Sequence, residues 1–501
     1  MSNDGTTRAT SLGGEAAPLR PEHRAAADCA PTTAQPAADP LMDRLRARRR
    51  RPMSVSSAPA PAMADGGPAA RPAGQRQGAP LLATKQESDF EKLPEVRALS
   101  LQRDALGLMG LAPPFFRRVD GPPLPATRVE GRESIRFTSY DYLGLNSHEA
   151  VREAAAAAIR AQGVSAGASR LVGGERAAQG ALEAALAAHY EAEDAVVMVS
   201  GHATNVTTIG TLLGPEDLVL LDSLGHNSSF EGARLSGATR RIFPHNDLDK
   251  LEALLAAERA RHRRALVVVE GLYSMDGDSP DLARLVTIKE RFGAWLMVDE
   301  AHALGVCGET GRGLFEAQGV DPGAVDIWMG TLSKTLASCG GYIAGSAALV
   351  SLLRYRAPGF VFSVGLAPAL AAAALAALQA MHREPGRVGR LVSNGRRLRD
   401  RARAAGLDTG TSTGLAVTPV VIGDSLKTVA LSNQLAEAGF EVAPIVHPAV
   451  PERAARLRFF VTAEHTAAQI DAAIAETARL AAGLDAWKEA AVQAAAARAR
   501  A

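Results

Sequence analysis

The chain has 501 residues, which leaves room for two or three domains. It holds 55 lysines and arginines against 54 aspartates and glutamates, so its formal net charge is +1 and no overall field favours nucleic acid or a membrane surface. Its three cysteines show neither a metal-ligand spacing nor a disulfide framework, and no apolar run reaches the roughly 20 residues that cross a bilayer, so we expect a cytoplasmic protein without a metal site or a membrane span.

Residues 1–95 are rich in alanine, proline, glycine, arginine and serine and contain almost no aromatic side chains. Such a segment cannot bury enough apolar surface to offset the entropy lost on ordering, so we predict a disordered extension. Within it, residues 40–51 form a basic cluster, which is most often simply a solvated tail. The alternative is a docking site for an acidic partner such as an acyl carrier protein.

An N-terminal arm, residues 96–140, is expected next, followed by a large domain over residues 141–382. The leucine pattern predicts a helix over residues 93–111, ended by two prolines, and an alanine-rich helix is expected over residues 151–162. A glycine-rich loop then carries Arg170, which could bind an anion. The alternative is a plain connection between two helices.

From residue 194 onward, apolar runs typical of strands alternate with helical segments, which predicts a mostly parallel sheet with helices on both faces. At the first strand-to-helix junction, Gly201 and His202 offer backbone N–H groups to an anion such as a phosphate. His226 follows the next strand. The carboxyl ends of parallel strands are where α/β proteins place their ligands, so these positions are expected to lie close together.

The remaining chain predicts a smaller α+β domain over residues 383–482 and an alanine-rich tail over residues 483–501. Its expected helices lie at 386–405, 425–438 and 467–482, and its expected strands at 416–422, 441–446 and 456–461.

Two stretches of the large domain carry residues suited to chemistry. One apolar run ends in Asp299, with His302 in the following turn, and another leads into Thr331-Leu-Ser333-Lys334. An amine among small hydroxyl residues can form a Schiff base with an aldehyde cofactor, and an acid can keep the pyridine nitrogen of pyridoxal phosphate protonated. The alternatives are an ordinary surface lysine and a helicase-type Asp-Glu-Ala-His box. The phosphate loop that such a helicase needs is missing from the sequence.

Several further motifs follow one another along the chain: Ser139-Tyr-Asp-Tyr-Leu-Gly144, Gly225-His226-Asn-Ser-Ser, Glu270-Gly-Leu-Tyr-Ser-Met-Asp-Gly-Asp278, Asp299-Glu-Ala-His-Ala-Leu-Gly-Val-Cys-Gly-Glu-Thr-Gly-Arg-Gly313, Thr331-Leu-Ser-Lys334 and Arg456-Leu-Arg-Phe-Phe-Val-Thr-Ala-Glu-His-Thr466. With these motifs in this order, the chain from about residue 96 to 482 resembles the α-oxoamine synthase family of pyridoxal phosphate enzymes. The version around Lys334 looks closer to serine palmitoyltransferases and to synthase modules of polyketide pathways than to the biotin or haem enzymes of the family.

The resemblance implies fold type I, with a seven-stranded type of large domain, and a homodimer with active sites at the subunit interface. It implies that Lys334 carries the cofactor, that Asp299 pairs with the pyridine nitrogen and that His226 stacks on the ring. Three groups of further residues follow from it: His302 and Ser274 near the ring hydroxyl; Gly201, His202, Thr331, Ser333 and, from the neighbouring subunit, Ser363 at the phosphate; Arg458, Arg170 and Tyr142 on the substrate side.

The activity that the resemblance implies is the decarboxylative condensation of an amino acid with an acyl thioester, which yields an α-amino ketone. Serine is the favoured amino acid, with alanine or glycine possible, and the acyl group could arrive on coenzyme A or on a carrier protein. The alternatives are an aminotransferase of the same fold and a non-catalytic regulatory subunit. The sequence departs from many relatives at Gln179 and at Asp141. It also has His447-Pro448 where some family members place a carboxylate-binding arginine before the proline, so Arg458 could bind the carboxylate alone or together with Arg170.

Overall fold

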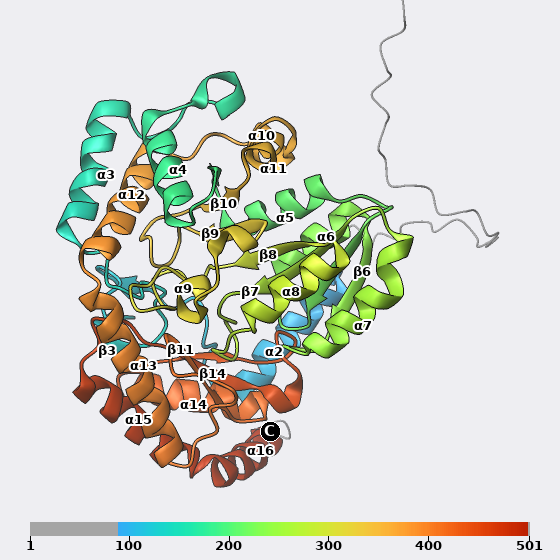
Figure 1. Cartoon of the computed structure of the whole chain (residues 1–501). Coiled ribbons are helices and arrows are strands. Elements are labelled where there is room, and N and C mark those ends of the chain that lie inside the picture. The colour runs from blue at the N-terminus through green and yellow to red at the C-terminus, as the bar shows by residue number, and fades with distance from the viewer. Residues whose placement is uncertain (1–88, 499–501) are drawn as a thin grey trace, which may run out of the picture. The chain divides into compact units, whose positions relative to one another are not determined.

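The computed structural model describes residues 89–498, and the predictions made for residues 1–88 and 499–501 lie outside this range. The described part is drawn as a ribbon in Figure 1. Its centre is a sheet of seven strands in the order β4-β10-β9-β8-β7-β5-β6. The strands are β4 (Asp194–Met198), β5 (Leu218–Asp222), β6 (Thr239–Phe243), β7 (Ala265–Glu270), β8 (Trp295–Asp299), β9 (Ile327–Thr331) and β10 (Gly341–Gly345).

This sheet is mostly parallel, as the alternating sequence pattern predicted. β6, β5, β7, β8 and β9 run parallel to one another, whereas β10 pairs antiparallel with both β9 and β4. Every residue of β5 and β7 is buried, because helices cover both faces of the sheet. The predicted fold, a fold type I architecture with a seven-stranded sheet, is thereby confirmed.

Two groups of helices form the two hydrophobic layers against the sheet. One layer contains α4 (Ala177–His189), α7 (Leu248–Glu258), α8 (Leu282–Phe292) and α12 (Pro368–Arg383), with α3 (Glu149–Gln162) packed on α12. The other contains α5 (Gly201–Leu212), α6 (Asn227–Ser236), α10 (Ala347–Arg356) and the short α11 (Pro358–Val361). Between β8 and β9 the chain forms the short helix α9 (Leu314–Gln318). In Figure 1, α7 and α8 lie in front of the sheet.

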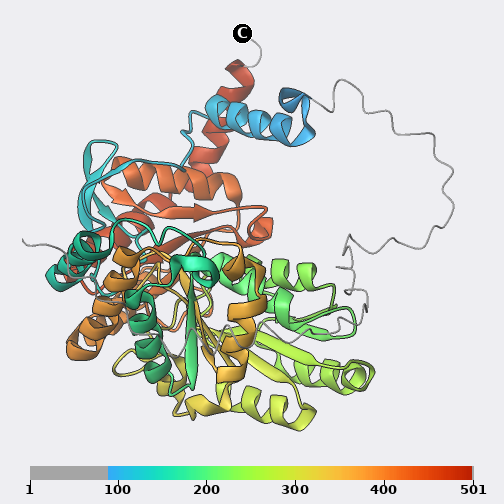
Figure 2. The same ribbon diagram turned by 90° about the horizontal axis from the view of Figure 1, so that it is seen from above.

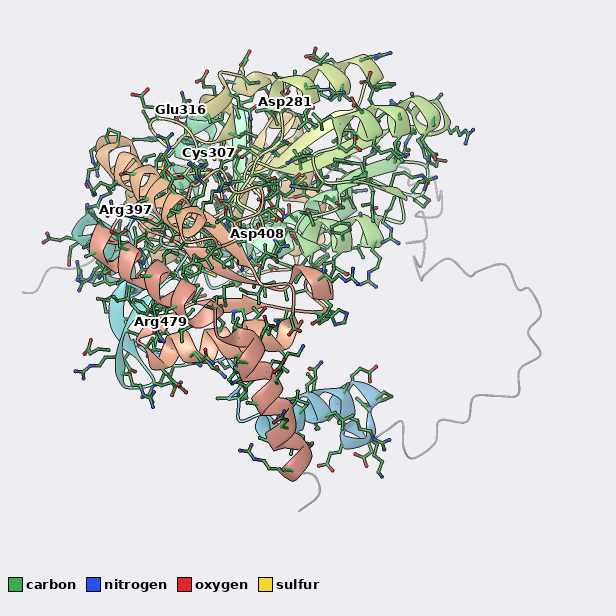
Figure 3. All side chains as sticks on the ribbon, turned by 90° about the horizontal axis from the view of Figure 1, so that it is seen from below. Asp281, Cys307, Glu316, Arg397, Asp408 and Arg479 are labelled. Carbon is green, nitrogen blue, oxygen red and sulfur yellow. The ribbon has the colours of Figure 1, made fainter. Side chains whose placement is uncertain are left out.

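The smaller domain has the α+β composition that the sequence predicted. Its sheet has the order β11-β14-β13, with β11 (Val417–Val421), β13 (Ala443–Ile445) and β14 (Arg456–Phe460). The helices α13 (Gly386–Ala404), α14 (Ser425–Glu437) and α15 (Ala467–Ala481) pack on this sheet and on one another. Arg397 of α13 donates to Asp471 of α15 at 2.8 Å, and Figure 3 labels this arginine.

The helix predicted over residues 93–111 is present in the arm, and both described chain ends hold further regular structure. The arm forms α2 (Pro94–Leu108) and a hairpin of β2 (Ala126–Val129) and β3 (Arg132–Arg136), with β1 (Val119–Asp120) beside it. β3 pairs in parallel with β12 (Phe440–Glu441), so the arm belongs to the smaller domain's side of the molecule. The alanine-rich segment forms α16 (Leu484–Arg498), and Figure 2 shows α2 lying across it. The domain boundaries at residues 141 and 383 stay predictions.

None of the helices within residues 89–498 is long and apolar enough to pass through a bilayer.

Candidate active site

The carboxyl ends of three neighbouring strands bring the predicted chemical residues together. β7 ends at Glu270, β8 ends at Asp299 and β9 ends at Thr331. Glu270 and Asp299 are direct partners in the register of β7 and β8, so both acids occupy the same level of the sheet. Lys334 follows β9 within one turn, which sets an amine beside two carboxylates.

Asp299 is buried and held by fixed hydrogen bonds. Its Oδ2 accepts a hydrogen bond of 2.9 Å from Asn205 Nδ2, and its Oδ1 accepts one of 3.0 Å from the backbone N–H of Ala301. Asn205 lies in the first turns of α5, and its amide also donates to Ser228 Oγ at 2.9 Å. The sequence did not indicate Asn205, because its contact with Asp299 depends on which side of α5 faces the end of β8.

His226 joins the same chain of hydrogen bonds. It is the N-cap of α6, where its Nδ1 accepts from the backbone N–H of Ser228 and lies 2.6 Å from Ser228 Oγ. The pKa of His226 is lowered, chiefly because neighbouring groups displace water from part of the ring and also because Lys334 is positive, while Asp299 opposes both. The imidazole is therefore neutral at pH 7, and its exposed ring is available for stacking.

Lys334 supplies the amine of this cluster. Its Nζ lies 5.8 Å from the centre of the Tyr140 ring. Burial lowers the pKa of Lys334 to about 8, against the attraction of Asp299 and Glu270 and with the help of Arg458. An amine with such a pKa is partly unprotonated near neutral pH, which nucleophilic attack on an aldehyde requires.

Glu270 is a second acid that sequence reasoning left without a role. It is buried, its Oε2 accepts a hydrogen bond of 3.3 Å from the backbone N–H of Ser274, and its Oε1 has no partner among the described residues. Burial, together with the charge of Asp299, raises the pKa of Glu270 to about 8, against the opposing charge of Lys334. Glu270 is therefore mostly protonated at pH 7.

His302 is neutral and is held by Tyr142. Its Nδ1 lies 2.6 Å from the hydroxyl of Tyr142, and its ring lies parallel to that of Phe460. Burial and the charge of Lys334 hold the pKa of His302 well below its usual range. Tyr142 is fully buried and meets the site through His302, so its contact with the substrate stays a prediction. The exposed aromatic residue of this motif is Tyr140.

The residues predicted to hold a phosphate also lie together. α5 begins at Gly201, and a Cβ added there would come within 2.9 Å of Thr331 Oγ1. Thr331 Oγ1 donates to the carbonyl of Gly340 at 2.9 Å and accepts from the backbone N–H of Ser333 at 3.2 Å. The ring of His202 lies 6.3 Å from that of His226. A helix N-terminus with a close glycine and hydroxyls nearby suits a dianion.

Arg458 approaches the site from β14 of the smaller domain. Its Nη1 donates to the carbonyl of Ser274 at 3.1 Å, its Nη2 lies 3.5 Å from the hydroxyl of Tyr140, and its guanidinium lies over the ring of Phe460. Its buried Nε has no partner among the described residues. A guanidinium that keeps donors unused can bind a carboxylate in the bidentate manner.

Arg170 does not join this group within the described chain, and its expected role on the substrate side stays a prediction. Its Nε and Nη2 donate to Glu175 at 2.7 and 2.6 Å, and Nη1 pairs with the buried Glu183 of α4. With both edges paired to carboxylates, the guanidinium has a structural role. Ser363 lies after α11 in the same small crevice as Arg170, so its role at a phosphate stays a prediction that needs a second subunit.

Three buried polar atoms around the site bear on whether pyridoxal phosphate fits there. Asn205 Oδ1, Glu270 Oε1 and Arg458 Nε are buried and have no hydrogen-bond partner among residues 89–498, and all three belong to residues around Lys334 and Asp299. Buried polar atoms are normally paired, so each of these three atoms is suited to pair with a polar ligand in the site. An acid for the ring nitrogen, an amine for the aldehyde and a helix N-terminus for the phosphate are all present, and the cofactor fits.

Comparison with known proteins agrees with this geometry. Residues 132–476 match the family described as aminotransferase class I and II. The chain is 44% identical over 343 residues to the 8-amino-7-oxononanoate synthase of Methylobacterium sp. (strain 4-46), covering 68% of this chain and 86% of that one. It is 43% identical over 358 residues to a putative 8-amino-7-oxononanoate synthase of Gloeobacter violaceus, covering 70% of this chain and 89% of the relative.

Solved structures of serine palmitoyltransferase are also similar. The enzyme of Sphingomonas wittichii has a TM-score of 0.75 and 31% identity over 79% of this chain and 99% of its own. The enzyme of S. paucimobilis with a bound PLP-myriocin aldimine has a TM-score of 0.76 and 28% identity, over 79% of this chain and 100% of its own. The chain therefore belongs to the aminotransferase class I and II family, as a pyridoxal phosphate-dependent α-oxoamine synthase of fold type I.

Proposed function

We propose that this α-oxoamine synthase condenses alanine with an acyl thioester and releases carbon dioxide and the free thiol. The observation that carries the proposal is the hydrogen-bonded chain from Asp299 through Asn205 and Ser228 to His226, with Lys334 and Arg458 beside it. It combines an acid for the cofactor, an amine for proton transfer and an arginine for the amino-acid carboxylate.

The choice of alanine rests on the relatives. An 8-amino-7-oxononanoate is a nine-carbon acid whose ketone and amine stand on neighbouring carbons next to a terminal methyl group. Its amine-bearing carbon and methyl group are those of alanine, and the other carbons form a seven-carbon acyl group with a terminal carboxylate. Relatives of this name reach 44% identity, against 31% for the serine palmitoyltransferase structure, so alanine replaces serine as the favoured amino acid.

Each side chain has a defined task in this reaction. Bound pyridoxal phosphate supplies an electron sink for the negative charge that develops on the Cα of the amino acid. Arg458 binds the carboxylate and orients the Cα–H bond, and the amine of Lys334 removes that proton. Asp299, fixed by Asn205, keeps a proton on the ring nitrogen. Neutral His226 stacks on the ring and donates a hydrogen bond to the thioester carbonyl as charge develops there.

The active form is proposed to be a homodimer. Leu171, Val172, Phe362 and Val364 are large apolar side chains that are exposed on the described chain, and they lie near Arg170 and Ser363. A second copy covering them would bring Ser363 to the phosphate of the neighbouring site. The acyl donor is proposed to be coenzyme A or a carrier protein, and the setting the cytoplasm. The basic cluster considered for carrier docking lies outside the described residues.

The test is a visible-absorbance titration of the purified protein with alanine, serine and glycine, with and without acyl thioesters. We expect a yellow bound chromophore whose spectrum responds most to alanine, and release of thiol and carbon dioxide only when both substrates are present. Lys334→Ala should hold no covalently attached chromophore. Amino-group transfer to a keto acid without thiol release would favour the aminotransferase, and failure to bind the cofactor would favour the regulatory subunit. A stronger response to serine than to alanine would show that serine, which the motifs indicated, is the amino-acid substrate.

A further inference from the structure

The buried contact between Tyr142 and His302 has a consequence beyond holding the imidazole in place. The two side chains come from the loop before α3 and the loop after β8, and the Tyr142 hydroxyl lies 2.6 Å from His302 Nδ1. Both residues are buried. In a neutral imidazole one nitrogen donates and the other accepts, so this contact determines which nitrogen holds the proton.

Two arrangements of the hydrogens are conceivable, and burial separates them. If His302 Nδ1–H donated to Tyr142, the phenolic hydrogen would need another acceptor, and no described residue other than His302 lies within hydrogen-bond distance of the Tyr142 hydroxyl. A buried donor without a partner costs about 1–3 kcal/mol. If the phenol donates to Nδ1, the phenolic hydrogen and Nδ1 are both paired, and the imidazole proton must be on Nε2.

Both groups stay in the required protonation states. Burial holds the pKa of Tyr142 well above its usual value, so the phenol keeps its hydrogen. Burial disfavours a second proton on the imidazole of His302, and so do the neighbouring Lys334, Arg458 and His226. The other titratable groups that face the ring are the phenols of Tyr140 and Tyr142. His302 Nε2 has no hydrogen-bond partner among the described residues. It is also not one of the fully buried polar atoms that lack a partner, so this nitrogen is accessible from the site.

We propose that Tyr142 is a positioning residue that fixes His302 in the Nε2-protonated tautomer, so that a neutral N–H donor always faces an oxygen of the bound cofactor ring. This inference rests on the proposed function in one respect, namely that the ring oxygen of pyridoxal phosphate is the acceptor. A donor of this kind stabilises the unprotonated, negative form of the oxygen and thereby lowers the proton affinity of the bound chromophore.

The test is the pH dependence of the visible spectrum of the cofactor-loaded protein. Tyr142→Phe removes only the hydroxyl, lets His302 exchange tautomers and should raise the pH midpoint of the colour change by about one unit, a tenfold change in proton affinity. The matched control is Tyr190→Phe, because Tyr190 is equally buried and its hydroxyl bonds to Tyr342 at 2.7 Å, outside the residues assigned to the site. Both variants should lose thermal stability, and only Tyr142→Phe should move the midpoint.

A double-mutant comparison separates positioning from a general loss of structure. A glutamine at 302 cannot exchange tautomers, so adding Tyr142→Phe to His302→Gln should cause no further shift. A midpoint unchanged in Tyr142→Phe, an equal shift in Tyr190→Phe, or a shift that persists in the His302→Gln background would each overturn the proposal.

Nitrogen NMR of ring-labelled histidine, assigned by comparison with His302→Gln, gives a readout that needs no turnover. Wild-type His302 should show a protonated Nε2 and an accepting Nδ1, and Tyr142→Phe a mixture of both tautomers. A protonated Nδ1 in the wild type would refute the inference even if the enzyme proved to be a synthase. The expected tautomer together with no condensation activity would refute the proposed function alone.

Discussion

Asn205 uses one amide group to hold both Asp299 and Ser228, with 2.9 Å between Nδ2 and each oxygen. Replacing Asn205 by alanine leaves the buried Asp299 carboxylate short of a hydrogen-bond donor, which costs about 1–3 kcal/mol. Asp299 is proposed to pair with the cofactor ring, so we expect the dissociation constant for pyridoxal phosphate to rise roughly tenfold to hundredfold. Equilibrium dialysis or fluorescence titration of the cofactor measures it.

A matched control for this variant is Asn433→Ala. Asn433 is also buried, on α14, and its amide donates to the carbonyl of Ala112 at 2.8 Å rather than to a residue of the site. It should lose comparable stability without a change in cofactor affinity. If the two variants weaken cofactor binding equally, the contact between Asn205 and Asp299 has no special role.

Arg458 should be needed for the amino acid and not for the cofactor. Arg458→Lys keeps the positive charge and loses the planar pair of donors that grips a carboxylate. We expect the spectral dissociation constant for alanine to rise about tenfold to hundredfold, corresponding to about 1.4–2.7 kcal/mol, with cofactor content unchanged. A lysine variant that binds alanine as tightly as the wild type would assign the carboxylate to another residue.

Arg170 should be needed for folding stability and not for binding the amino acid, because its guanidinium is already paired with Glu175 and Glu183. Arg170→Met leaves Glu183 buried beside fewer cations, and breaking a buried pair of this kind costs about 3–5 kcal/mol. Arg354 also donates to Glu183, at 3.0 Å, and should keep the loss near the lower end. Urea denaturation measures the loss, and the dissociation constant of the folded variant for alanine should match the wild type. A variant of normal stability with weak alanine binding would return Arg170 to the substrate side.

The parts of the site that sequence reasoning predicted are those at strand ends and in contiguous motifs. Asp299, Lys334 and His226 each follow an apolar run, and parallel strands end at one edge of their sheet, so sequence order alone brings them together. Gly201 could be predicted in the same way from the start of a helix after a strand. The resemblance added their roles.

The missed parts depend on relations that no single segment contains. Glu270 became important only when the register of β7 and β8 set it beside Asp299, and Asn205 only through the phase of α5. The pairing of Arg170 with two acids could not be predicted from its glycine-rich loop, because those acids lie on α4 and in the turn before it. Likewise, the pairing of β3 with β12 joins segments about 300 residues apart, and nothing local in either sequence signals it.

Glu270 should make stability depend on pH in a direction unusual for a carboxyl group. Its pKa rises from 4.5 to about 8 in the folded protein, so between these values the folded state holds a proton that the unfolded state has released. Folding stability contributed by this group therefore falls as pH rises from about 4.5 to 8. Glu270→Gln stays neutral, so its melting temperature relative to wild type should increase from pH 5 to pH 8. A constant difference across this range would mean that Glu270 is ionised in the folded protein.

His245 provides the complementary case at high pH. It lies between Asp222 and Asp278, at 3.0 and 3.1 Å, with Asn246 and the edge of the Tyr273 ring as its other neighbours. Burial lowers its proton affinity, but the two carboxylates outweigh this and raise the pKa of His245 to about 10. The group's contribution to stability is therefore complete below about pH 6.5 and is lost as pH rises through about 10.

His245→Gln should therefore lower the melting temperature strongly at pH 7 and progressively less toward pH 10.5. The matched control is His189→Gln, because burial lowers the pKa of His189 to about 3 and the imidazole is neutral throughout this range. The deficit of that variant should not change between pH 7 and pH 10.5. If the melting temperature of His245→Gln also stays below that of the wild type by a constant amount, His245 lies between its two acids as a neutral imidazole. The predicted loss of stability at high pH would then not come from His245.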